Sequence, residues 1–109
     1  AYVTRSEAKW RLGKDGLSDI NTIRERSGAD AISELTKQAL VDEWSREFYT
    51  EGRRRSDLIR FGMFTGNAYN WSWKGGVAKG QSVDSHYRYY PIPQDDINNN
   101  PNMHQNKDY

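Results

Sequence analysis

The stretch from Gly62 to Tyr109 constrains the fold most, because it carries almost no aliphatic side chains from which a core could be built. Its aliphatic residues other than alanine are Met63, Val77, Val83, Ile92, Ile97 and Met103. Its glycines and its run of asparagines are typical of loops, and irregular stretches of this length are uncommon inside compact domains. We therefore expect residues 63–109 to form an irregular tail that wraps around helices and is anchored by aromatic residues and prolines.

Residues 1–62 have the helical periodicity that the tail lacks. Apolar residues recur at helical spacing in residues 2–12 and again in residues 17–23, with a glycine-containing turn between the two segments. Ser18 or Asp19 is expected to cap the second helix. Two helices joined by a tight turn form a helical hairpin of the kind that stacks in solenoids. One such hairpin cannot bury both of its faces, so we expect the remainder of a longer protein upstream to cover it.

A third helical segment is predicted over residues 37–59, with Thr36 as its N-cap. Its apolar row consists of Val41, Trp44, Phe48 and Ile59. The expected fold class is therefore mostly α: a helical hairpin plus one long helix in residues 1–62, followed by the irregular wrapping tail in residues 63–109.

Charged residues form a second row on the predicted long helix, where three glutamates recur every four residues. Stacked carboxylates suit a metal centre or acid–base catalysis, but a di-iron bundle also needs Glu-x-x-His pairs. Both histidines lie in the irregular half instead. Neighbouring arginines favour a structural ion-pair lattice, whose predicted members are Glu43, Glu47, Glu51, Arg54, Asp57 and Arg60. No catalytic residue, metal ligand or cofactor is predicted.

Composition excludes several other classes of function. Cysteine is absent, which rules out disulfides and thiolate chemistry. The net charge of +1 gives no general attraction to nucleic acid. No apolar run reaches the ~18–20 residues that a membrane-spanning helix needs. The serines lack histidine and aspartate at the spacing of a known nucleophile motif, so we predict that the chain is not an enzyme.

Tyr69, Trp71 and Trp73 alternate in a segment rich in glycine and asparagine, and two interpretations of them remain open. As ligand-binding residues, flat aromatic side chains would stack against sugar rings. As structural residues, they would anchor an irregular segment that has few other apolar side chains. Anchoring is the favoured interpretation.

A set of motifs in a fixed order resembles the SusD/RagB family of nutrient-binding proteins and spans nearly the whole chain. The matching segments are Arg5-Ser6-Glu7-Ala8, Asn21-x-Ile23-Arg24-x-Arg26-x-Gly28, Glu51-Gly52-Arg53-Arg54, Asp57-Leu58-x-Arg60-x-Gly62, Pro91-Ile92-Pro93, Asn100-Pro101 and Gln105-Asn106. The sequence departs from the family pattern at two places. Trp44 and Ser45 stand where arginine is usual, and Lys107-Asp108 replaces a common Pro-Gly.

The resemblance implies a mostly helical, non-catalytic protein, built on tetratricopeptide-like helical hairpins, that is lipid-anchored on the extracellular face of the outer membrane. Such proteins capture oligosaccharides or polysaccharides and act with a TonB-dependent, SusC-like transporter. The chain would be the C-terminal part of one, with the lipid anchor and much of the ligand surface in the missing N-terminal segment. The matched motifs are scaffold motifs, so the resemblance transfers no ligand-binding residue.

Two alternatives stay open: a peptide-binding, RagB-like member, and a stand-alone helical-repeat module for protein interaction. The sequence does not separate a glycan ligand from a peptide ligand, because the ligand is set outside the matched motifs. A hydrolase, the third class of function considered, finds no supporting arrangement of residues.

Overall fold

The computed structural model describes residues 1–109, which divide into two compact units, Ala1–Phe61 and Gly62–Tyr109. The first unit holds helices α1 (Tyr2–Arg11), α2 (Leu17–Arg26), α3 (Lys37–Glu47) and α4 (Arg54–Arg60). The second holds α5 (Gln94–Asn99) and two 3-10 turns, η1 (Lys74–Gly76) and η2 (Ser85–Arg88). The expectation of a mostly α fold is confirmed. None of the helices has both the length and the apolar character that crossing a bilayer requires.

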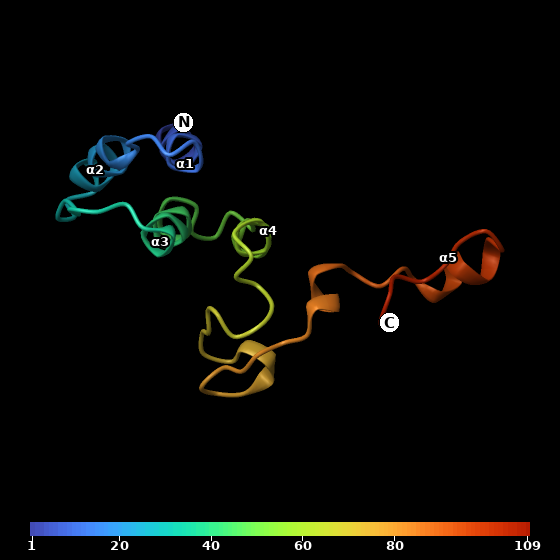
Figure 1. The fold of residues 1–109 in the computed structure, drawn as a ribbon. Helices are drawn as coiled ribbons and strands as arrows, with labels where there is room; N and C mark the ends of the chain where they lie inside the picture. Colours follow the sequence, from blue (N-terminus) through green and yellow to red (C-terminus); the bar gives the residue numbers. More distant parts are fainter. The chain divides into compact units, whose positions relative to one another are not determined.

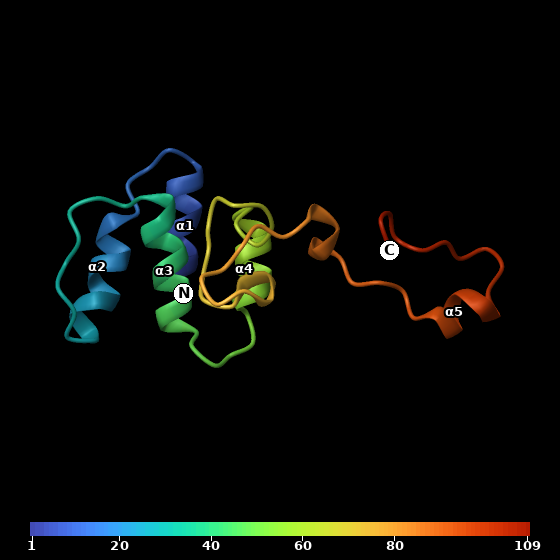
Figure 2. The same ribbon diagram turned by 90° about the horizontal axis from the view of Figure 1, so that it is seen from below.

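The four helices of the first unit lie side by side. Figure 1 looks nearly along their axes, and Figure 2 shows α1 and α2 running antiparallel, as do α3 and α4. Helix α1 packs against both α2 and α3, and α3 packs against α4. This arrangement places one face of every helix toward a shared interior.

The apolar stripes of the helices meet in that interior. The buried apolar residues of the first unit are Val3, Ile20, Ile23, Leu40, Val41, Trp44, Leu58 and Phe61. Fully burying a side chain of this size contributes roughly 1.5–3 kcal/mol, so this cluster is the main source of the unit's stability.

Gly16 allows α1 to approach the start of α2 very closely. A Cβ atom at this position would lie 2.5 Å from the backbone oxygen of Ser6, far inside van der Waals contact. The Ser6 hydroxyl, itself fully buried, donates a 2.8 Å hydrogen bond to the Gly16 carbonyl. The turn therefore requires glycine at position 16. The hydrogen bond from Ser6 to Gly16 connects the two helices inside the core.

The predicted long helix over residues 37–59 is wrong, because the chain breaks it into α3 and α4. Thr36 does cap α3, accepting a 3.1 Å hydrogen bond from the Ala39 N–H. Between the two helices, Thr50 and Gly52 adopt left-handed backbone conformations with φ of 67° and 71°. A helix cannot continue through positive φ, so α4 starts afresh and returns antiparallel to α3.

The predicted cap of α2 is also wrong. Helix α2 begins one residue before Ser18, and the side chain that serves its start is Asp15, which accepts a 2.8 Å hydrogen bond from the Leu17 N–H. Asp19 is occupied elsewhere, in ion pairs with Arg5 and Lys9 at 2.5 Å and 2.9 Å. A carboxylate that joins two helices in this way is not free to act as a cap.

The second unit is largely irregular, in line with the sequence, although it contains the unpredicted helix α5. The segment after α5 returns to the residues that precede it. Gln105 exchanges two hydrogen bonds with the backbone of Ile92, at 2.8 Å and 2.9 Å. Asn106 donates to the Tyr90 carbonyl at 2.7 Å. These side-chain amides bind the backbone where paired strands would use backbone hydrogen bonds. The wrapping of this unit around helices stays a prediction.

Candidate functional site

The three aromatic residues considered as ligand contacts lie in one closed loop, residues 66–83, here called the aromatic loop. An antiparallel bridge closes the loop, and the Gly66 N–H donates to the Val83 carbonyl at 2.8 Å. Figure 1 draws the loop in yellow and gold, turning back on itself. Because the bridge joins its two ends, the loop has a defined shape.

Lys74 lies at the centre of the aromatic loop and is only 2% exposed. Its ammonium donates to the carbonyls of Gly66 and Tyr69 at 2.8 Å and 2.6 Å. The same nitrogen lies 4.9 Å from the centroid of the Trp71 ring, within cation–π range. Burial lowers the pKa of Lys74 below its ordinary value. The lysine thus joins three parts of the loop from inside.

The backbone of the loop closes tightly around this lysine. The exposed Gln81 donates through its side chain to the Gly75 carbonyl at 2.8 Å and through its N–H to the Lys74 carbonyl at 3.1 Å. At Gly80, a Cβ atom would lie 2.3 Å from the Trp71 carbonyl oxygen. The loop therefore depends on glycine at this position as well as on Lys74.

The structure separates the three aromatic residues into two groups. Tyr69 and Trp71 are half-buried and lie against each other with ring centroids 5.9 Å apart, and Trp71 also stacks on Phe64 at 6.1 Å. Trp73, in contrast, is 69% exposed and has a left-handed backbone with φ of 69°. Within this unit, Tyr69 and Trp71 occupy packed positions, whereas Trp73 presents its indole to the surface.

Sequence reasoning missed two members of this site, Phe64 and Lys74. Lysine is almost never fully buried, so no local pattern marks Lys74 as an interior residue. The available signal was its place between Trp73 and two glycines, which would have suggested a tight turn in which a long side chain folds inward.

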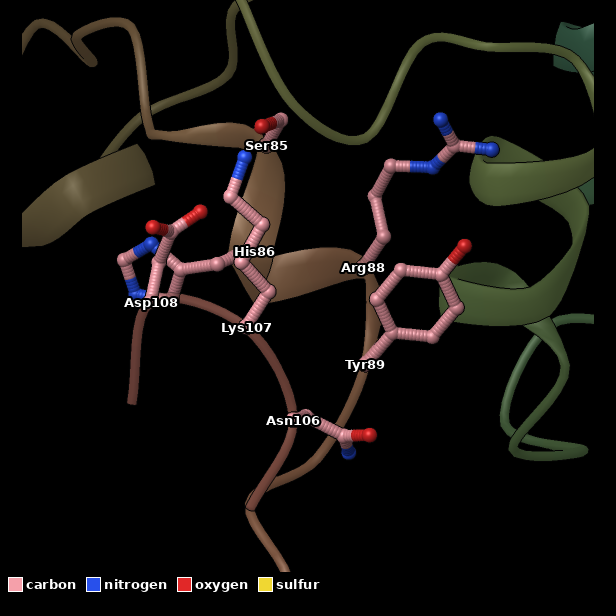
Figure 3. A pocket seen from close by; sticks show the side chains of 7 residues that line it. All are labelled: Ser85, His86, Arg88, Tyr89, Asn106, Lys107 and Asp108. Atoms are coloured by element: carbon pink, nitrogen blue, oxygen red, sulfur yellow. The ribbon is translucent and has the colours of Figure 1, made fainter. Parts of the chain in front are cut away.

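A hollow lies in the C-terminal part of the same unit and has a volume of about 280 Å³. Its lining consists of Ser85, His86, Arg88, Tyr89, Asn106, Lys107 and Asp108. Figure 3 shows the side chains of Lys107 and Arg88 extending in the same direction, with the His86 ring beside Asp108. The lining residues are exposed or half-buried, so this is a shallow polar hollow without a buried group directed into it.

Ser85, His86 and Asp84 do not form a catalytic relay. The Asp84 carboxylate accepts from the His86 N–H at 3.0 Å and faces the His86 ring nitrogen Nδ1 at 2.9 Å. These contacts lower the pKa of Asp84, chiefly through the backbone bond. The Ser85 hydroxyl also lies toward Asp84, at 3.5 Å, instead of being linked to it through the imidazole. The carboxylate therefore acts as the cap of η2.

The charged residues of α3 and α4 lie in several separate contacts. Glu43 is buried and accepts from Arg24 and Arg46, and Glu47 pairs with Arg26 at 2.6 Å. In α4, Asp57 is buried and pairs with Arg60 at 2.9 Å.

For the other two predicted members of the ion-pair lattice, Arg54 and Glu51, the structure shows a backbone contact and an exposed position. Arg54 donates to the Val41 carbonyl at 2.8 Å, which connects α4 to the backbone of α3. Glu51 is exposed in the connection between these helices. Because the helix breaks before Glu51, the three glutamates do not continue along a single helical face.

Glu7 is a buried carboxylate that sequence reasoning did not single out. It accepts from Arg60, from Arg11 at 2.6 Å and from the Trp44 indole N–H at 2.7 Å. Burial by itself would raise the pKa of Glu7, but the hydrogen bonds from Arg60 and Arg11 outweigh it and hold the pKa below its ordinary value. A single carboxylate thus connects α1 to both α3 and α4.

The structure contains no group of three or more acidic or histidine side chains arranged to hold a metal ion. The buried carboxylates of the first unit contact arginine or lysine side chains instead; they are Glu7, Asp19, Glu43 and Asp57. Chemically, the chain offers a rigid helical scaffold with internal ion pairs and one exposed indole on a shaped loop.

Comparison with known proteins gives one family and one curated relative. The model of the SusD family matches residues 1–109. The chain is 58% identical over 110 aligned positions to the starch-binding protein SusD of Bacteroides thetaiotaomicron, an alignment that covers 100% of this chain and 20% of that protein. The chain therefore spans about a fifth of the length of this relative, and it matches the relative's C-terminal portion.

Proposed function

The chain belongs to the SusD family, and from this premise we propose that the protein of which it is part binds starch or a related glucan without cleaving it. The observation that carries the proposal is the 58% identity to a starch-binding protein along the whole chain. Because the alignment covers 20% of that relative, the ligand is proposed for the full-length protein and not for this segment alone.

The acidic residues support a binding role over a hydrolytic one. Glycoside hydrolysis uses two carboxyl groups that flank the scissile bond, one of them kept protonated as an acid. Here the buried carboxylates Glu7, Glu43 and Asp57 each face arginine side chains. Contact with a cation favours the ionised form of a carboxyl group, which is the opposite of what a general acid needs.

The first unit supplies the scaffold of this proposed receptor. Its helices are joined by side-chain contacts between elements distant in sequence, such as Glu7 with Arg60 and Arg24 with Glu43. A support of this kind holds a ligand surface in a fixed geometry, which reduces the entropy that is lost on binding.

We further propose that the mature protein is lipid-anchored on the outer face of the outer membrane and delivers oligosaccharides to a SusC-like, TonB-dependent transporter. Membership in the family supports this placement. Surface exposure is tested by protease treatment of intact cells, and the partner is tested by mild detergent extraction followed by affinity purification of the tagged full-length protein. Recovery of a TonB-dependent transporter in near-equal amount is the expected result.

The ligand proposal is tested with the full-length protein by native gel electrophoresis through gels that contain starch. We expect strong retardation in starch and none in gels that contain a β-linked glucan of similar viscosity. Incubation of the protein with starch should release no reducing ends. If the full-length protein bound peptides and its migration were not retarded by any glycan, the glucan proposal would be wrong and the peptide-binding alternative would be favoured.

A further inference from the structure

We propose that Trp73 is a sugar-stacking residue and that Lys74 positions it by shaping the aromatic loop from inside. The inference rests on the proposed function, because the ligand class is that of the full-length receptor. It adds a specific contact within this chain, where the family motifs identify only scaffold residues.

Exposure of Trp73 alone does not carry the inference, since isolated exposed apolar side chains are common. The backbone supplies the second observation. Trp73 has φ of 69°, a left-handed conformation in which bulky residues are genuine outliers. Glycine would adopt this conformation without strain, as Gly75 and Gly76 do directly afterwards. Strained residues of this kind are concentrated at ligand sites, where the surrounding structure holds them in place.

Hydrogen bonds fix the peptide groups of Trp73 and leave its side chain free. Its N–H donates to the Ala78 carbonyl at 3.4 Å, and its carbonyl accepts from the Gly76 N–H at 3.0 Å. The neighbouring residue, Lys74, is fixed at both its backbone and its side chain. Its N–H donates to the Trp71 carbonyl at 3.1 Å, and its buried ammonium donates to the Gly66 carbonyl. The indole is therefore mounted on an ordered backbone.

Lys74 is the residue on which this geometry depends. Its ammonium joins the carbonyls of Gly66 and Tyr69, which both belong to the first part of the loop. Because this charge is used inside the loop, it is not presented to a ligand. The indole of Trp73 is itself a neutral, flat aromatic surface, which suits the apolar face of a hexose ring.

An indole on an ordered support also restricts how a ligand can approach. Aromatic side chains lose little conformational entropy on binding, and a fixed backbone reduces that loss further. A glucan chain offers a repeated series of identical ring faces to such a surface. We therefore assign to Trp73 the stacking of one glucose unit of a bound chain.

The test uses the full-length protein and two variants, Trp73→Ala and Lys74→Met. Tyr49→Ala is the matched control, since Tyr49 is an exposed aromatic residue of the other unit. Affinity for starch is measured by gel retardation, and thermal stability is measured on the same preparations. We expect Trp73→Ala to weaken binding about 10-fold, equivalent to about 1.4 kcal/mol, with an unchanged melting temperature. Tyr49→Ala should change neither quantity.

Lys74→Met separates positioning from general destabilisation. Methionine has a similar length but cannot donate to the two carbonyls, so the loop should lose its shape and binding should weaken. If Lys74 acts through Trp73, the double variant should bind no more weakly than Trp73→Ala alone. Additive losses would contradict a positioning role.

The outcomes distinguish this inference from the proposed function. Absence of starch binding by the unmodified protein would overturn the proposed function itself. Normal binding by Trp73→Ala would overturn only the inference. A large fall in melting temperature on replacing Trp73 would show that another part of the protein covers the indole, which also overturns it.

Discussion

The indole N–H of Trp44 donates a 2.7 Å hydrogen bond to the buried carboxylate of Glu7, although the two residues are 37 positions apart in the sequence. The guanidinium groups of Arg53 and Arg60 lie over the same indole, 4.6 Å and 5.0 Å from its centroid. Arg60 also pairs with Glu7. The contact therefore joins the first, third and fourth helices at one point.

Replacing Glu7 with alanine should strongly destabilise the protein. The change leaves Arg60 and the Trp44 N–H without their buried partner, and breaking a buried pair of this kind costs on the order of 3–5 kcal/mol. Urea denaturation of the full-length protein checks the prediction. Glu25→Ala, an exposed glutamate of α2, is the control and should remain within about 0.5 kcal/mol of the unmodified protein.

Asp57→Ala should also destabilise, because Asp57 is buried and pairs with Arg60 at 2.9 Å and Arg53 at 3.7 Å. We expect a loss of about 3 kcal/mol in the free energy of unfolding. The exposed Asp95 of α5 provides the comparison for a carboxylate without burial. Equal melting temperatures for Asp57→Ala and Asp95→Ala would refute the structural role of this ion pair.

The acid stability of the protein should depend in part on Asp19. Hydrogen bonds from Arg5 and Lys9 lower the pKa of Asp19 from 3.8 to about 2 in the folded state. The unfolded chain therefore binds a proton at a higher pH than the folded chain, and the stabilisation is complete above pH 3.8 and is lost as the pH falls toward 2.

Denaturation measured from pH 6 down to about pH 2 tests this expectation in the unmodified protein and in Asp19→Asn. The variant should be less stable at neutral pH and should lose stability less steeply in the acid range, since it has no carboxylate to protonate at this position. If the free energy of unfolding depended on pH identically in the two proteins, Asp19 would have no part in the acid stability.

Gly16→Ala should destabilise through a steric clash. The added Cβ would meet the Ser6 backbone oxygen at 2.5 Å, and the backbone cannot yield without separating the two helices. Gly13→Ala is the informative comparison, since its Cβ would meet nothing within 4 Å but its φ of 67° imposes strain. We expect a loss of about 1 kcal/mol for Gly13→Ala and about 3 kcal/mol for Gly16→Ala, measured by thermal melts.

Local signals in the sequence predicted several elements of the fold. Thr36 precedes a periodic apolar segment and caps α3, as a hydroxyl residue at that place should. Helix α5 had a similar signal that was overlooked. It follows Pro93 and has Asp95 and Asp96 in its first turn, a pattern that favours a helix start.

The break between α3 and α4 was not predictable in the same way. In the sequence the apolar row extends from Val41 to Ile59, and a single glycine at position 52 is tolerated in a helix at modest cost. The left-handed conformation of Thr50 is contrary to the preference of a β-branched residue. Tertiary contacts, such as Arg54 with the Val41 carbonyl, contribute to stabilising this turn.

The candidate site was predictable only in its aromatic residues. The alternating positions of Tyr69, Trp71 and Trp73 in the sequence indicate a group of aromatic residues. They do not indicate which of these residues is packed and which is exposed. That distinction depends on Lys74 and on the closure of the loop at Gly66 and Val83. Partners of a buried lysine are set by the folded backbone, and no pattern in the sequence encodes them directly.

The central claim, that the full-length protein is a glucan-binding member of its family, is tested most directly by titration calorimetry with a linear maltooligosaccharide. The account predicts saturable binding, with no release of reducing ends during the titration. The absence of heat of binding with any α-linked oligosaccharide, from a preparation that melts cooperatively, would contradict it.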